Sequence, residues 1–222
     1  MKLKVIITGA TGMVGEGVML ECIQNDVIEK ILLINRKPTG ISNPKVEEII
    51  HADFNDISAL EDRLKDFNAC YFCSGVSSLG MKEEQYLAVT YTLTLNFARI
   101  LAKVNPNLTF CYVSGAGTDS SEKGKLMWAR IKGKTENDLM KLPFKAVYNF
   151  RPAFMKPAKG AKNIKGYYKV IGFLYPLLRK IAPKYFLTLQ EVAKAMIYVS
   201  FKANEKKVLE VEDILKLSQM QS

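Results

Sequence analysis

The chain has 222 residues, a length that fits one α/β domain with at most a small appendage. Apolar residues make up 48% of it, which is enough for a sizeable core, and no stretch has the composition of a disordered segment. No apolar run reaches the ~20 residues that a membrane-spanning helix needs, and the formal net charge of +10 is strongly basic.

Strands and helices are predicted to alternate over the first 150 residues. Continuous apolar runs such as 31–34 are typical of parallel strands covered on both faces, whereas Val14, Val18 and Cys22 repeat at the helical period. The expected strands are 4–8, 31–34, 46–50, 69–73, 109–113 and 146–150. The expected helices are 14–23, 58–65 with a capping box from Ser58 to Glu61, 83–104 and 127–140. This order predicts an α/β fold, a Rossmann-like doubly wound parallel sheet with helices on both faces.

After residue 150 the alternation stops and a basic segment begins. Residues 151–185 hold nine Lys or Arg and no Asp or Glu, which leaves 23 basic against 22 acidic residues elsewhere. Apolar residues at three- and four-residue steps predict a basic amphipathic helix over 164–175. A helix at 190–201, a strand at 208–211 and a helix from 213 would end the chain. We therefore expect a single domain, 1–222, with 151–185 as a small substrate-side insertion or basic lid, or else a solvated surface with no partner.

A glycine-rich segment, 8–15, lies between the first strand and the first helix. Gly9 would allow the tight turn, Gly12 would let backbone N–H groups approach a pyrophosphate, and Gly15 would let the helix pack against the strand. The residues expected to form this dinucleotide site are Gly9, Thr11, Gly12, Met13, Val14 and Gly15. The alternative is a tight turn that binds no ligand.

The ends of later strands supply the rest of the predicted site, because ligands bind beyond the carboxyl ends of such strands. The second strand ends in cations, beginning with Arg36, where an acid would accept from a ribose hydroxyl. A guanidinium binds phosphate bidentately, so NADP is favoured and NAD is the alternative cofactor. Asp53 and Phe54 would contact the adenine, unless Asp53 is only a turn residue. Ser74 and Gly75 would let the backbone pass close to the ribose.

The cysteines and the lone histidine carry no predicted chemistry. All four cysteines lie among apolar neighbours, which is typical of buried free thiols in a reducing compartment and predicts a cytoplasmic location. Cys70 and Cys73 have the CxxC spacing but lie in a strand-like run, whereas a redox pair or half a zinc site needs a turn or a helix start. His51 has no ligand set at suitable spacing, so no metal site is expected.

These motifs resemble the short-chain dehydrogenase/reductase superfamily, most closely its atypical and extended branches, such as the NmrA-like NAD(P)H-binding and NAD-dependent epimerase/dehydratase-like proteins. The resemblance rests on 8–15, Asp53-Phe54, Val113-Ser114 and Arg151-Pro152, and covers about two thirds of the chain. It implies a nicotinamide cofactor and an oxidoreductase or epimerase-like activity.

The resemblance also implies catalytic positions, and this sequence departs from them. The superfamily carries Tyr-x-x-x-Lys on the helix after the fifth strand, and a serine at the end of that strand. Lys132 matches the lysine, Trp128 stands in place of the tyrosine, and Ser114 is the serine equivalent, although relatives often place it where this chain has Gly115 and Ala116. An indole N–H does not titrate in water, so Trp128 cannot exchange a proton with a substrate. The alternatives are a match shifted by chance or a tyrosine from another element, namely Tyr71, Tyr86, Tyr91, Tyr112, Tyr167 or Tyr168.

Two functions of different classes follow from this pattern. The first is an NADP(H)-dependent oxidoreductase or epimerase-like enzyme, whose small-molecule substrate would be acidic or phosphorylated because of the cations in 151–185. The second is a cofactor-sensing regulatory or scaffold protein without turnover. The amphipathic segment is compatible with a homodimer contact or a peripheral membrane contact. It has no nucleic-acid-binding motif, so no nucleic acid partner is expected.

Overall fold

A seven-stranded parallel sheet forms the centre of the molecule. The computed structural model describes residues 2–158, 160, 163, 175, 178–182 and 185–220. The strand order is β3-β2-β1-β4-β5-β6-β9, and every neighbouring pair runs parallel. The strands are β1 (Leu3–Thr8), β2 (Ile28–Asn35), β3 (Val46–Ile50), β4 (Ala69–Phe72), β5 (Thr109–Val113), β6 (Ala146–Phe150) and β9 (Val208–Leu209). The chain reverses its direction of travel across the sheet between β1 and β4, and this switch point is where such sheets bind ligands.

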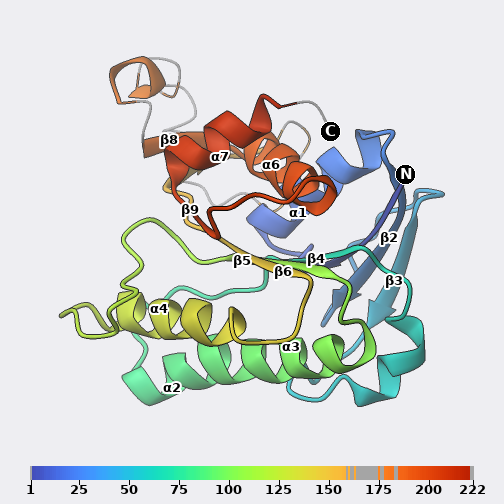
Figure 1. Ribbon diagram of the computed structural model, residues 1–222, viewed down its shortest axis with the longest axis horizontal. Helices are drawn as coiled ribbons and strands as arrows, with labels where there is room; N and C mark the ends of the chain where they lie inside the picture. The colour runs from blue at the N-terminus through green and yellow to red at the C-terminus, as the bar shows by residue number, and fades with distance from the viewer. Residues whose placement is uncertain are drawn as a thin grey trace.

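Helices cover both faces of the sheet, so the predicted fold class is confirmed. In Figure 1, α1 (Met13–Gln24), α6 (Leu189–Phe201) and α7 (Val211–Ser218) lie on one face, and α2 (Glu83–Leu87), α3 (Leu93–Val104) and α4 (Met127–Leu139) lie on the other. Each face has its own cluster of buried apolar residues. Alternate residues of β1 show the division, because Ile7 belongs to one cluster and Ile6 to the other.

Two predicted helices differ from expectation in detail. Residues Ser58–Arg63 form a 3-10 helix rather than an α-helix, and Ser58 makes no cap for it. The Asp56 carboxylate accepts from Ser58 N at 2.9 Å instead. The long helix predicted over 83–104 is interrupted by a π-helical turn, Ala88–Thr92, between α2 and α3. Such turns are rare and often occur beside functional sites.

The C-terminal third contains a small sheet that the sequence pattern did not predict. Strands β7 (Phe154–Lys156) and β8 (Phe186–Thr188) pair in parallel, and the Phe154 and Phe186 rings lie 5.5 Å apart between centroids. The expected strand 208–211 is shorter, because Glu210 instead forms a capping box with Asp213 at the start of α7. The helix predicted over 164–175 lies outside the described residues. Within the described part of the chain, no helix is both long and apolar enough to span a bilayer.

The close contact between the glycine turn and α1 gives a stability prediction. We expect Gly15→Ala to lower the free energy of unfolding by about 1–3 kcal/mol, because a Cβ there would lie 2.3 Å from Gly9 O. The matched control is Gly12→Ala, whose Cβ would lie 3.4 Å from the same oxygen in an ordinary extended conformation, so its cost should stay below about 1 kcal/mol. Urea denaturation of both variants tests this, and equal losses would contradict it.

Candidate functional site

The glycine turn forms one wall of the candidate site. Gly9 has a φ of 73°, and a Cβ on it would lie 2.8 Å from the backbone of Cys73 and Ser74 at the end of β4. Gly12 N donates to Gly9 O at 2.9 Å, which closes the turn just before α1. The first amide N–H groups of any helix have no acceptor within the helix. In α1 no side chain caps this end either. This is the geometry in which a phosphate binds at a helix N-terminus.

A pocket of about 270 Å³ opens beside this turn. It lies at the carboxyl ends of β1, β2 and β4, on both sides of the switch point. Its lining residues come from the glycine turn, the ends of those strands, the segment after β3 and the π-helical part of the long helix. They are Gly9, Thr11, Gly12, Asn35, Arg36, Phe54, Cys73, Ser74, Gly75, Val76, Val89 and Leu93.

Seven of these lining residues were predicted from the sequence, namely Gly9, Thr11, Gly12, Arg36, Phe54, Ser74 and Gly75. Met13, Val14 and Gly15 belong to α1 and do not line the pocket. The Asp53 carboxylate is exposed and accepts from Asn55 N at 2.9 Å, which is the turn role that the sequence left open. Phe54 is buried and stacks on Phe97, so most of its ring packs into the core.

The sequence analysis missed five lining residues, including Asn35, Val89 and Leu93. Asn35 is buried at the last position of β2, where its Oδ1 accepts from Ala10 N at 3.1 Å. Its position immediately before Arg36 was the available signal. Val89 and Leu93 carry no signal, because in a regular helical pattern they belong with the core residues of a helix. The π-helical turn that interrupts this helix was not predictable from the pattern.

Ser114 follows β5, Trp128 and Lys132 lie on α4, and none of the three lines this pocket. The Ser114 hydroxyl lies 2.5 Å from Glu136 Oε1 and 3.1 Å from Phe150 O. It therefore donates its single proton to acceptors within the protein. Lys132 Nζ donates to Ser114 O. Burial lowers the pKa of Lys132 to about 8, although the negative charge of Glu136 opposes this effect. Trp128 is half-buried, and its ring lies against Gly117, where a Cβ would be 3.5 Å from Trp128 Cη2.

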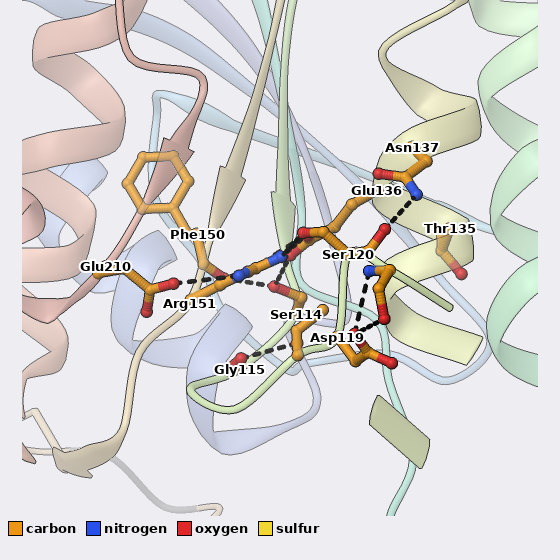
Figure 2. A network of polar contacts seen from close by, with 12 residues as sticks. Ser114, Gly115, Asp119, Ser120, Thr135, Glu136, Asn137, Phe150, Arg151 and Glu210 are labelled. Atoms are coloured by element: carbon orange, nitrogen blue, oxygen red, sulfur yellow. Dashed lines mark hydrogen bonds and ion pairs between the residues drawn. The ribbon is translucent and has the colours of Figure 1, made fainter. Parts of the chain in front are cut away.

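A buried ion pair joins the elements around Ser114 (Figure 2). Glu136 on α4 is fully buried and accepts from Arg151 Nε at 3.0 Å and from Arg151 Nη2 at 2.5 Å. Arg151 follows β6, and its other contacts are Glu210 Oε1 at 3.1 Å and Ser120 Oγ at 2.5 Å. Burial lowers the pKa of Arg151, but the hydrogen bonds and charges of Glu136 and Glu210 together raise it by more. Arg151, which the resemblance placed among the family motifs, therefore has a structural partner.

Four of the six tyrosines proposed as substitutes for the missing one are described, and none of them lines the pocket. Tyr71 is buried against Ser200 on the α6 face, with the two hydroxyls 3.1 Å apart. Tyr91 donates to Asp138 at 2.8 Å. Tyr112 belongs to the buried cluster on the opposite face of the sheet from Tyr71, and Tyr86 is buried on α2, which covers that face (Figure 1). The remaining two, at positions 167 and 168, lie outside the described residues.

The basic segment is partly neutralised by contacts inside the protein. Besides Arg151, Arg179 pairs with Glu191 on α6 at 2.5 Å, and the Lys156 ammonium lies 5.0 Å from the Tyr175 ring centroid. The described residues contain no group of three or more His, Cys, Asp or Glu arranged to hold a metal ion. The cysteines there are free thiols, and Cys73, which lines the pocket, is the one that is not fully buried.

The parallel sheet, the glycine turn and the pocket at the switch point define a Rossmann-like fold of the short-chain dehydrogenase/reductase type. The model of the NAD dependent epimerase/dehydratase family matches residues 5–125, which is more than half of the chain. The chain therefore belongs to that family.

Individual relatives are distant. Protein FMP52, mitochondrial, of Meyerozyma guilliermondii is 25% identical over 209 residues, which cover 89% of this chain and 85% of the relative. The ADP-L-glycero-D-manno-heptose-6-epimerase of Helicobacter pylori superposes with a TM-score of 0.67 at 16% identity, covering 98% of this chain and 82% of that one. The Bordetella bronchiseptica enzyme WbmG, solved in complex with NAD and UDP, gives a TM-score of 0.67 at 15% identity, with coverage of 98% and 78%. At these identities the solved structures establish the fold alone.

The comparisons correct the predicted location. Burial of the thiols led us to expect a cytoplasmic protein, yet the relative from Meyerozyma guilliermondii and three further matching relatives carry the word mitochondrial in their names. The cytoplasmic prediction is therefore wrong. Buried thiols were a poor guide, because a cysteine inside a core is protected in any compartment that does not form disulfides.

The buried ion pair gives a second stability prediction. Glu136→Gln should lower the free energy of unfolding by about 3–5 kcal/mol, because it removes the buried partner of Arg151 and leaves only the half-exposed Glu210 to balance that charge. Glu83→Gln breaks a pair with Arg130 in which Glu83 is mostly exposed, so its cost should stay below about 1 kcal/mol. Chemical denaturation measures both, and a loss at Glu136 as small as that at Glu83 would refute the structural role.

Lys132 gives a prediction about pH. Its pKa is about 8 when folded, whereas an unperturbed lysine has 10.5, so the unfolded chain holds the proton over that range and the folded chain releases it. The free energy of unfolding of the wild type should therefore rise, relative to Lys132→Met, as the pH increases from 8 to 10.5. Urea titrations across this range test the difference. Parallel curves for the two proteins would show that Lys132 titrates normally.

Proposed function

We propose that this protein binds NADP(H) in the pocket at the switch point and acts as an oxidoreductase or epimerase-like enzyme. The observation that carries the proposal is the pairing of an uncapped helix N-terminus with Arg36 in one pocket. The first suits the pyrophosphate and the second suits a 2′-phosphate. The glycine turn also fits the cofactor sterically, since Gly12 is exposed and has no Cβ to stand between the backbone and the phosphates.

The remaining site residues would orient the cofactor rather than exchange protons. When bound, the nicotinamide supplies or accepts a hydride. Lys132 is anchored to Ser114 O, which makes it suited to donate to a ribose hydroxyl on the side of β5. Trp128, one helical turn earlier, offers an apolar wall and a single N–H donor. With Ser114 committed to Glu136, the described residues at this place supply no hydroxyl acid.

This arrangement favours substrates that do not need a tyrosine proton. Reduction of a quinone or a flavin is of this kind, because water or the substrate itself can supply the proton after hydride transfer. An acidic or phosphorylated substrate is supported by the exposed Lys180, although Arg151 and Arg179 are already paired. The WbmG complex, which contains NAD together with UDP, is consistent with a small-molecule substrate beside a nucleotide.

A second function, a cofactor-bound sensor or scaffold without turnover, is supported by the same departures. Trp128 replaces the expected proton donor, and the Ser114 hydroxyl is buried in hydrogen bonds. The two functions separate on turnover with a panel of carbonyl and quinone acceptors. Steady oxidation of NADPH that is lost in Lys132→Met would exclude the sensor. Tight binding of NADPH without oxidation across the panel would favour it.

Cofactor binding is tested by titrating the purified protein with NADPH and with NADH. We expect saturable quenching of the only tryptophan, Trp128, with tighter binding of NADPH. Arg36→Ala should weaken NADPH binding by about 10–100-fold and leave NADH binding within about twofold, because NADH has no 2′-phosphate to lose a charged contact.

The control is Arg63→Ala, since Arg63 is an exposed arginine that pairs with Glu47 away from the pocket. Calorimetry checks any titration that gives no fluorescence change. Absence of binding by both methods would mean that the glycine turn is structural. Equal affinity for NADH and NADPH would remove the proposed role of Arg36.

A further inference from the structure

A single carboxylate on β3 closes the short segment that carries Arg36. Glu48 Oε1 accepts from Asn35 Nδ2 at 2.9 Å and from Thr39 N at 3.0 Å, and its second oxygen lies 3.3 Å from Thr39 N. Asn35 and Thr39 stand on either side of residues 36–38. Glu48 therefore joins the two ends of that segment, one through a side chain and the other through the backbone.

The same carboxylate sets the orientation of the Asn35 side chain. Asn35 is 2% exposed, and its Nδ2 points to Glu48 while its Oδ1 accepts from Ala10 N at 3.1 Å. A carboxylate has no proton to donate, so the Asn35 amide must present its Nδ2 to Glu48. The amide oxygen, Oδ1, then faces the glycine turn. One continuous chain of hydrogen bonds thus runs from Thr39 through Glu48 and Asn35 to Ala10.

This arrangement has a consequence for charge at the pocket. The end of β2 has no acid of its own, and the oxygens of the carboxylate beside it are occupied by the N–H groups of Asn35 and Thr39. Arg36 lines the pocket, and in the described part of the chain no carboxylate forms an ion pair with it. The segment therefore presents a cation while its neighbouring acid faces inward.

We propose that Glu48 is the positioning residue for cofactor selectivity, because it holds the segment between Asn35 and Thr39 in the shape that directs Arg36 into the pocket. This inference rests on the proposed NADP(H) function. Glu48 does not touch the cofactor in this scheme and acts through Arg36. Its removal should therefore affect only a ligand that uses Arg36.

The experiment compares the dissociation constants of NADPH and NADH by calorimetry in three variants. Glu48→Ala should weaken NADPH binding about tenfold and leave NADH binding within about twofold, since two hydrogen bonds that hold the segment are lost. Glu48→Gln keeps one acceptor oxygen and should give an intermediate loss of about threefold. Glu47→Ala, on the same strand but paired with Lys30 and Arg63 at the surface, should leave both constants unchanged.

A double-mutant cycle with Arg36→Ala distinguishes positioning from a general structural role. In the Arg36→Ala background, Glu48→Ala should cause no further loss of NADPH affinity, because the group through which it acts is already absent. Additive losses, or equal losses for NADPH and NADH, would overturn the proposal. A gain in NADPH affinity on removing Glu48 would also overturn it, since the carboxylate would then be repelling the phosphate.

Failure of this inference is distinguishable from failure of the proposed function. If the wild type binds neither nucleotide, or prefers NADH, the proposed function fails before any variant is made. If the wild type prefers NADPH and the preference survives in Glu48→Ala, only the role of Glu48 fails. Thermal unfolding of each variant shows whether it folds. If Glu48→Ala does not fold, the test uses Glu48→Gln, and an unchanged preference of that variant for NADPH refutes the proposal.

Discussion

The buried carboxylate of Glu136 is the constraint on which the second half of the sheet depends. It is fully buried on α4, and the guanidinium of Arg151 reaches it from the end of β6. Arg151 also contacts Ser120 before α4 and Glu210 at the start of α7, so three separate segments meet at one planar group (Figure 2). Removing two charges from water costs nearly as much as their attraction returns, so the pair adds little net stability. Losing one partner, by contrast, leaves a charge with no water to solvate it.

The same carboxylate limits the chemistry beside it. It holds the Ser114 hydroxyl, which leaves the Ser114 carbonyl as the acceptor for Lys132. The Ser114 hydroxyl and the Lys132 ammonium are thus committed to hydrogen bonds inside the protein, and neither residue lines the pocket. Half of the residues that line the pocket are Gly, Ser, Thr or Cys, and Arg36 is the one ionised side chain among them, which suits binding better than proton transfer.

The sequence predicted those features whose residues are close together along the chain. The glycine turn and the strand before it lie within the first 15 residues, and continuous apolar runs marked the parallel strands because both of their faces are buried. The sequence did not identify Glu136 as a buried ion-pair residue, because a charged residue on an amphipathic helix normally faces water. Its partner, Arg151, is 15 residues further along the chain, just after β6. The pair of β7 and β8 was missed for a similar reason, since each has only three residues and their pairing is set by tertiary contacts. The predicted residues that line the pocket are mostly those of the glycine turn and of strand ends, whereas Asn35 and Val89 line it without having been among the predicted site residues.

Charge counted along the sequence overstates the field that a ligand meets at the surface. Residues 151–185 contain nine cations and no acids, yet Arg151 at the start of this segment pairs with Glu136 and Glu210. Near its end, Arg179 pairs with Glu191, a residue that also caps α6 through Thr188. The acids that neutralise these arginines come from other elements, which is why the segment itself appeared uncompensated. Both arginines attach the segment to the α/β core, which leaves the attraction of the proposed anionic substrate to lysines of the segment such as the exposed Lys180. A cation that is paired with a carboxylate contributes little to the potential beyond about 10 Å at moderate salt, and these two arginines therefore act as anchors of the fold rather than as attractors of the proposed substrate.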